Sequence, residues 1–201
     1  MKSKVIYQGQ WTEDLISKYG KGRQVWLDGS LYEGQWMNGK GNGIGRLIHA
    51  DGDIYQGEWK NDMANGRGKY VHYEGQVYEG MWKDDKQEGH GVEVWQDGAK
   101  YEGDYVRGKK QGQGKFMWRD GASYFGSFKN NDIEGRGLYQ WADGRSYDGE
   151  WLANKMHGKG IFKYPDGRIY EGSYIKDKKD GQGTLKMKDG RIFTGFWKNG
   201  R

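Results

Sequence analysis

The sequence lacks cysteine and contains a single proline among its 201 residues. Without cysteine the chain has no disulfide and no thiolate metal site, which favours a reducing, cytoplasmic setting. No apolar run approaches the length of a signal-peptide core or a membrane-spanning helix. Hydrophobic residues make up only 34% of the chain, and the aliphatic ones are too few to fill one globular core. A disulfide-stabilised domain and a conventional mixed core are both excluded.

Glycine and aromatic residues are abundant instead, with 37 Gly, 10 Trp and 15 Tyr. Glycine-rich chains are often disordered, but a solvated disordered chain rarely carries so many large rings. The composition therefore predicts ordered, aromatic-rich structure. The 33 basic and 28 acidic residues leave a net charge of only +5, spread along the chain. We expect no nucleic-acid partner and at most weak binding to acidic lipid.

A 23-residue period runs through the chain, marked by one aromatic residue in each repeat: Tyr32, Tyr55, Tyr78, Tyr101, Tyr124, Tyr147, Tyr170 and Phe193. Tyr7 precedes this series by 25 residues, and the two extra residues lie between Trp11 and Gly20. The period predicts one repeat array over residues 1–201, with repeats starting at 7, 32, 55, 78, 101, 124, 147 and 170 and a partial ninth at 193.

Glycine recurs 2, 11, 13 and 20 residues after the tyrosine of each repeat, and an aromatic residue recurs 4 residues after it. These four positions hold 33 of the 37 glycines, so the glycine content indicates order. The pattern closely resembles the MORN (membrane occupation and recognition nexus) repeat family over essentially the whole chain. The resemblance implies consecutive β-hairpins and a role in cytoskeletal, ciliary or membrane-associated assemblies. It also implies that such repeats can precede lipid kinase or methyltransferase domains.

The turn residues predict the strand register without the family name. Ala50-Asp51-Gly52 suits a three-residue hairpin loop that ends in a left-handed glycine. A two-residue Asp-Gly turn is the alternative, but it would place Trp141 and Tyr147 on opposite faces. The three-residue loop sets Leu47 opposite Tyr55. The second hairpin of each repeat is expected to close through a six-residue segment such as 60–65.

The predicted fold is all-β: an elongated, twisted, single-layer antiparallel sheet of consecutive hairpins. Because side chains alternate between faces, one face carries the tyrosine ladder, with facing glycines that leave room for the rings. Large rings flank the ladder on both sides, and a contiguous apolar surface of this kind usually marks an interaction site. We therefore predict a partner-binding groove formed by Trp59, Trp82, Glu93, Trp95, Trp118, Trp141 and Trp151.

No catalytic, cofactor-binding or metal-binding constellation is apparent in the sequence. His49 and His72 share a repeat position, but their pattern fits aromatic substitutes for tryptophan better than a metal pair. Glu93 is the one charge inside the ladder. It either receives a basic group from a partner or is satisfied by tyrosine hydroxyls. The chain is thus expected to be a non-enzymatic protein-binding scaffold.

Two other functions also fit the sequence. One is binding to an acidic membrane surface through basic loops, such as the loop of Arg107, Lys109 and Lys110 or that of Lys176, Lys178 and Lys179, although Asp177 and Asp180 oppose it. The other is an accessory region of a larger enzyme.

The face opposite the ladder carries aliphatic pairs in the first repeats only. Val25 faces Leu31, and the same register pairs Ile48 with Ile54 and Val71 with Val77. Strand propensity alone explains β-branched residues anywhere in a sheet. Because the aliphatic pairs are confined to one end, we expect a partner or a second copy to cover Ile48, Ile54, Val71 and Val77.

Overall fold

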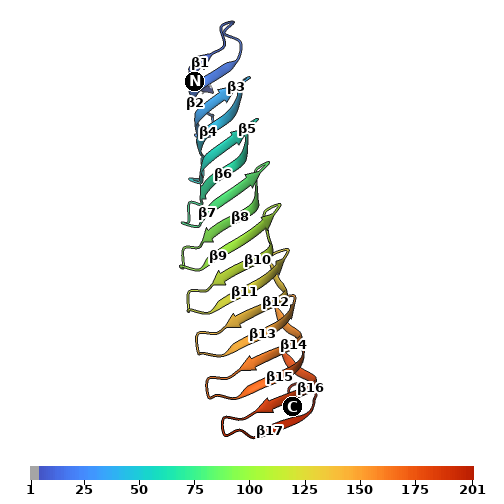
Figure 1. Cartoon of the computed structure of the whole chain (residues 1–201). Coiled ribbons are helices and arrows are strands. Elements are labelled where there is room, and N and C mark those ends of the chain that lie inside the picture. Colours follow the sequence, from blue (N-terminus) through green and yellow to red (C-terminus); the bar gives the residue numbers. More distant parts are fainter. Residues whose placement is uncertain (1–4) are drawn as a thin grey trace. The chain divides into compact units, whose positions relative to one another are not determined.

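The computed structural model describes residues 5–201, which contain strands and turns and no helix. The strands follow one another in chain order (Figure 1). They are β1 (Ile6–Trp11), β2 (Lys18–Val25), β3 (Leu31–Met37), β4 (Lys40–Ile48), β5 (Ile54–Lys60), β6 (Met63–Val71), β7 (Val77–Lys83), β8 (Lys86–Val94), β9 (Lys100–Val106), β10 (Lys109–Met117), β11 (Ser123–Lys129), β12 (Asp132–Gln140), β13 (Ser146–Leu152), β14 (Lys155–Lys163), β15 (Ile169–Ile175), β16 (Lys178–Lys186) and β17 (Ile192–Trp197).

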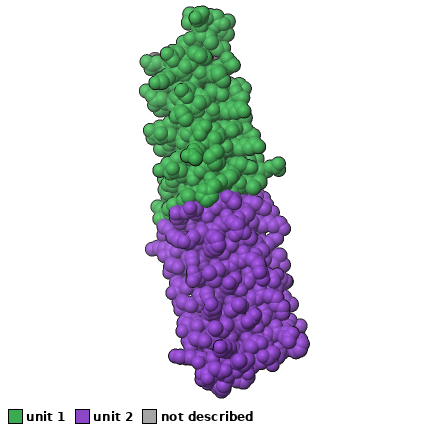
Figure 2. All heavy atoms as spheres, in the orientation of Figure 1, with its two compact units in different colours: residues 1–96, 105–108 green, residues 97–104, 109–201 purple. Residues whose placement is uncertain are grey.

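The strands form one open antiparallel sheet of 17 strands, as the repeat pattern predicts. The chain divides into two compact units. Unit 1 comprises Met1–Gln96 and Tyr105–Gly108, and unit 2 comprises Asp97–Asp104 and Lys109–Arg201 (Figure 2). Strands β1–β8 lie in unit 1 and β10–β17 in unit 2.

The three-residue hairpin loops are confirmed. Beyond the last strand pair, Ile48 with Ile54, the His49 N–H donates to the Asp53 carbonyl at 2.8 Å, and the Gly52 N–H donates to the His49 carbonyl at 3.0 Å. Gly52 has a φ of +101°, a conformation that glycine adopts without steric cost. This geometry places Leu47 opposite Tyr55, as predicted.

The expectation of six-residue segments at the other edge is wrong. Lys60 pairs directly with Met63, so only Asn61 and Asp62 form the turn. Both have positive φ, +52° and +67°, which is typical of a type I′ hairpin turn and is tolerated by Asn and Asp. A bulge between Gly57 and Trp59 absorbs the remaining residues of the longer strand.

Each buried tyrosine of the ladder lies across a pair of facing glycines. Tyr124 is fully buried, and a methyl group placed on Gly137 would lie 2.3 Å from its hydroxyl oxygen. Gly137 faces Gly126 across strands β12 and β11. The Tyr124 hydroxyl donates to the Ser127 carbonyl at 3.0 Å. Burial raises the pKa of the Tyr124 hydroxyl to about 12, because a phenolate would lose its solvation there.

We predict that Gly126→Ala destabilises the protein by about 1–3 kcal/mol, because the added methyl group overpacks a filled site. It would lie 2.5 Å from the Tyr124 hydroxyl, the Arg136 carbonyl oxygen and the Gly137 Cα. Gly195→Ala is the matched control, since it changes the same repeat position and meets nothing within 4 Å. Thermal and urea unfolding of both variants measure the difference. Equal stability of the two would contradict the ring-over-glycine packing.

Candidate functional site, an aromatic surface on one face of the sheet

One row of aromatic rings lies between the tyrosine ladder and the two-residue turns. We call these the turn-side rings: Trp36, Trp59, Trp82, Tyr105, Phe128, Trp151 and Tyr174. Each packs edge-to-face against tyrosines of adjacent repeats; Trp59, for example, has its ring centroid 5.1 Å from that of Tyr32 and 5.0 Å from that of Tyr55. Edge-to-face pairs add stabilisation beyond their buried area. The turn-side rings therefore join each repeat to the next.

The turn-side tryptophans also donate hydrogen bonds to the backbone. The indole N–H of Trp59 donates to the Gly45 carbonyl at 3.0 Å, and that of Trp151 donates to the Gly137 carbonyl at 3.1 Å. Trp59 is 9% exposed and Trp151 is 6% exposed, whereas Trp82 is half-buried. Two of the predicted partner-binding tryptophans are thus largely enclosed by their own sheet.

In unit 1 the aromatic face is hollowed. Two adjoining cavities of about 520 and 600 Å³ share Leu47, His49, Trp59 and Asp62 as lining residues. The hollow exists because small residues face the turn-side rings: Gly41 lies opposite Trp36, and Ala64 lies opposite Trp59. Trp82 lines the second cavity.

Charged side chains lie at the edges of this hollow. Asp62 accepts a hydrogen bond from the Gly41 N–H at 2.7 Å, while its own N–H donates to the Gly41 carbonyl at 3.0 Å. Lys18 has its ammonium 4.5 Å from the centroid of the Trp36 ring. Burial lowers the pKa of Lys18, and the nearby Asp62 carboxylate partly counteracts that effect. Sequence reasoning missed both residues, although the recurrence of Asn and Asp in the turns was visible in the 23-residue period.

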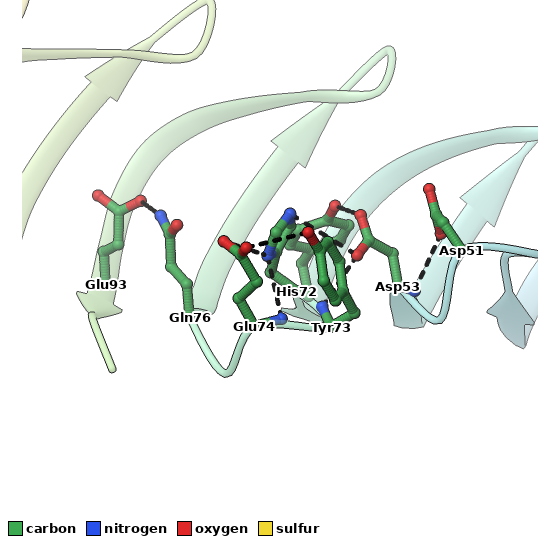
Figure 3. Close-up of polar contacts among 8 residues, drawn as sticks. Asp51, Asp53, His72, Tyr73, Glu74, Gln76 and Glu93 are labelled. Carbon is green, nitrogen blue, oxygen red and sulfur yellow. Dashed lines mark hydrogen bonds and ion pairs between the residues drawn. The ribbon is translucent and has the colours of Figure 1, made fainter. Parts of the chain in front are cut away.

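A polar cluster lies at the loop edge of unit 1 (Figure 3). Asp53 accepts hydrogen bonds from the Tyr70 hydroxyl and the Tyr73 N–H, and its carboxylate lies 3.9 Å from His72 Nε2. Burial acts to raise the pKa of Asp53, but these hydrogen bonds and the histidine outweigh it and hold the pKa below its usual value. On the other side of the imidazole, His72 Nδ1 accepts the Glu74 N–H at 3.2 Å. The cluster ties adjacent loops together.

Glu93 is 6% exposed and satisfied within unit 1. The Tyr105 hydroxyl donates to one carboxylate oxygen at 2.8 Å. Gln76 Nε2 donates to the other at 2.6 Å (Figure 3). The sequence left two alternatives for Glu93, a basic group from a partner or tyrosine hydroxyls. The structure shows the second, with a glutamine amide as a further donor to the carboxylate. Tyr105 fills the turn-side position that tryptophan holds in other repeats, and its hydroxyl reaches the carboxylate where an indole would bond to glycine.

In unit 2 a second row of rings lies toward the three-residue loops. We call these the loop-side rings: Phe116, Trp118, Tyr139, Trp141, Phe162 and Tyr164. Successive centroids are 4.5–5.4 Å apart, and successive planes are tilted by 36–48°. Trp118 and Trp141 are half-buried, and within residues 5–201 neither indole N–H has a hydrogen-bond partner. In unit 1, Trp95 is half-buried just after β8.

Basic side chains accompany the loop-side rings. The Arg145 guanidinium lies 5.2 Å from the centroid of the Trp141 ring, and the Arg168 guanidinium lies 4.6 Å from that of Tyr164. Lys179 lies 4.4 Å from the centroid of Tyr170. Such cation–π contacts hold cations against the aromatic surface. Arg145 and Arg168 are also ion-paired with Asp143 and Asp166, each at 2.8 Å. The site therefore combines half-buried rings, indole N–H groups without an acceptor in residues 5–201, and arginine–aspartate pairs.

Among residues 5–201, no group of three or more His, Asp or Glu side chains gathers as a metal site would require. In that described range, no helix is long and apolar enough to cross a membrane.

Three solved structures are similar to this chain to different degrees. The wild-type TCP10 domain of Danio rerio CPAP has a TM-score of 0.50 at 11% identity, with 96% of this chain and 94% of that chain covered. The G-box domain of the microcephaly protein CPAP has a TM-score of 0.44 at 13% sequence identity, with 89% of this chain and 100% of that chain covered. The SAS-4 TCP domain of Drosophila melanogaster was solved in complex with a proline-rich motif of Ana2. It has a TM-score of 0.43 at 12% sequence identity, with 98% of this chain and 95% of that chain covered.

A search of curated protein sequences finds no match. A family model described as MORN repeat matches eight consecutive segments: 7–31, 32–54, 55–77, 78–100, 101–123, 124–144, 147–167 and 170–190. Each segment begins at the tyrosine that marks its repeat in the 23-residue period, and together the segments cover most of the sequence. The chain belongs to the MORN repeat family.

Proposed function

We propose that this chain is a non-enzymatic scaffold that binds a segment of a partner protein along the loop-side rings of unit 2. One observation carries the proposal: Trp118 and Trp141 are half-buried, stacked in a continuous row, and free of the backbone hydrogen bond that the turn-side tryptophans make. Rigid rings of this kind provide large contact area at low entropic cost and are enriched among binding hot spots.

The charges beside the rings define the chemistry of the partner. Arg145 and Arg168 lie over ring faces, and each is already paired with a neighbouring aspartate, so a predominantly apolar segment fits this surface best. The hollow in unit 1 offers a second place for apolar side chains, with Trp59 and Trp82 in its lining. Family membership supports a cytoplasmic site of action at cytoskeletal, ciliary or membrane-associated assemblies.

The two ring rows should differ in their effect on stability. We predict that Trp59→Phe lowers the free energy of unfolding by about 1–2 kcal/mol, because the Gly45 carbonyl loses its indole donor in a buried site. Trp118→Phe should change it by less than about 0.5 kcal/mol, because no intramolecular hydrogen bond is lost. Urea unfolding measures both. If Trp118→Phe is as destabilising as Trp59→Phe, the loop-side rings are structural and the proposed binding role loses its support.

For binding, we predict that Trp118→Ala combined with Trp141→Ala raises the Kd of a captured partner by about 30-fold or more, because two hot-spot rings are removed. The partner is first captured from the native cell and then purified, and its affinity is measured by calorimetry. Phe125→Ala is the matched control, since this exposed ring of unit 2 lies on the opposite face. An unchanged Kd for a folded double variant would exclude the loop-side rings as the binding surface.

Binding to acidic lipid should be weak. Lys110 and Lys179 lie 5.1 and 4.4 Å from the centroids of Tyr101 and Tyr170, so they are held against rings rather than extended toward a bilayer. We therefore expect binding to phosphatidylserine vesicles only at low ionic strength and none at physiological salt, because screening removes the remaining attraction. Vesicle flotation, with zwitterionic vesicles as the control, measures this. Tight binding that persists at high salt would favour membrane-surface binding over the protein scaffold.

A further inference from the structure

The face of unit 1 opposite the aromatic surface carries a continuous aliphatic stripe. Each member pairs across strands with the next, from β1 to β8: Ile6, Val25, Leu31, Ile48, Ile54, Val71, Val77 and Val94. None of these side chains is buried, and the two end members, Ile6 and Val94, are 63% and 38% exposed. No helix or second sheet in residues 5–201 covers this face.

The repeat does not require this stripe. The same positions in β10–β17 of unit 2 are mostly polar or charged: Met117, Ser123, Gln140, Ser146, Lys163, Ile169, Lys186 and Ile192. The strands of both units are equally regular, so strand propensity does not account for the difference. The apolar surface is a property of unit 1 alone.

A row of mostly charged side chains runs beside the stripe on the same face. Its members lie two residues along each strand from those of the stripe, as Glu33 does from Leu31. From β1 to β8 it consists of Gln8, Arg23, Glu33, Arg46, Gln56, Lys69, Glu79 and Val92. Arg23 faces Glu33 across strands, and Lys69 faces Glu79. Within residues 5–201, neither of these oppositely charged couples forms an ion pair. All four side chains are exposed. These charges are available to an external partner.

The stripe and the charge row share one midpoint, between β4 and β5. Two of the four pairs of positions at equal distance from it carry opposite charges: Arg23 on β2 corresponds to Glu79 on β7, and Glu33 on β3 corresponds to Lys69 on β6. The other correspondences, Arg46 with Gln56 and Gln8 with Val92, bring no like charges together. The row is therefore self-complementary under a two-fold rotation about an axis that lies along the strands between β4 and β5.

Two hollows lie beyond the charge row. One shallow hollow of about 610 Å³ extends from Gln8 on β1 to Ile44 on β4, and another of about 590 Å³ extends from Ile44 to His90 on β8. In the adjacent row, the rotation sets Ile44 against Glu58, Gln35 against Arg67 and Lys21 against Met81, which brings no like charges together and pairs no opposite ones. Side chains of a partner can enter both hollows.

We propose that unit 1 binds a second copy of this chain through this face, as a two-fold sandwich with antiparallel strand order. In a two-fold contact of this kind the same patch of both copies meets, so the patch must be complementary to itself. When the two sheets pack face to face, the stripe of one copy is buried against the stripe of the other. Eight strands that each contribute three outward residues supply about two dozen residues per copy, the size of a standard stable interface. The charge symmetry favours a second copy over an unrelated protein, since only a second copy makes self-complementarity useful. This surface is separate from the aromatic surface and does not depend on it.

The apolar contribution is tested with one substitution at two equivalent positions. Ile54 and Ile169 occupy the same repeat position, but Ile54 lies between Ile48 and Val71, whereas Ile169 lies between Lys163 and Lys186. Ile54→Thr keeps β-branching and removes apolar surface, so we expect the dimer Kd to rise roughly tenfold or more. Ile169→Thr should leave the Kd unchanged. Sedimentation equilibrium of the full chain over a wide concentration range measures both.

The antiparallel arrangement is tested by charge reversal and mixing. Glu33→Lys alone and Lys69→Glu alone each place like charges together twice in a homodimer, so each variant should dimerise about tenfold more weakly than the wild type. In a one-to-one mixture of the two variants, both contacts are opposite in charge again, and the heterodimer should recover wild-type affinity. A variant that simply misfolds would not be rescued by mixing.

Three outcomes would overturn the proposal. A wild-type chain that remains monomeric up to millimolar concentration has no such interface. Equal effects of Ile54→Thr and Ile169→Thr would show that the stripe is not the contact. Dimers that are weakened by the single charge reversals but not restored in the mixture would exclude the antiparallel two-fold geometry.

Discussion

The packing of a tyrosine ring across two facing glycines is the contact on which the rest of this structure depends. The ring needs bare backbone on both strands, which is why two glycine positions of every repeat are occupied by nothing larger. Its hydroxyl donates to a carbonyl three residues later, as Tyr55 does to Glu58 at 3.0 Å. Its edges contact turn-side rings of adjacent repeats. Stability in each unit is thus a sum of contacts between neighbouring repeats, without a central aliphatic core.

This packing divides the aromatic residues into two kinds. Turn-side tryptophans complete the sheet, because their indole N–H groups satisfy carbonyls of the glycine strand. The loop-side tryptophans Trp118 and Trp141 make no such bond within residues 5–201, and both are half-buried. The residue facing each turn-side ring then decides whether the surface is hollow or filled: Gly41 and Ala64 leave a cavity in unit 1, whereas Ile133 and Met156 face Phe128 and Trp151 in unit 2. One repeat frame therefore presents different surfaces.

Because side chains alternate between the faces of a strand, the opposite face varies independently of the aromatic packing. The rings and glycines constrain one face, and the other is free to carry aliphatic residues in unit 1 and polar residues at the same positions in unit 2. Two binding surfaces can then coexist on one sheet without competing for residues. The self-complementary order of Arg23, Glu33, Lys69 and Glu79 concerns only the second face.

The sequence by itself determined the repeat frame, the three-residue loops, the register and the division into two faces, because each follows from local rules of glycine conformation and strand alternation. It did not determine which rings are exposed. Trp59 and Trp118 are both tryptophans that flank the ladder, yet within residues 5–201 only Trp59 of the two reaches a glycine carbonyl. Nor did it show that Asn61 and Asp62 close a two-residue turn, or that Tyr105 and Gln76 satisfy Glu93. Tertiary structure decided these, because burial and hydrogen-bond partners depend on side chains that adjacent hairpins bring together.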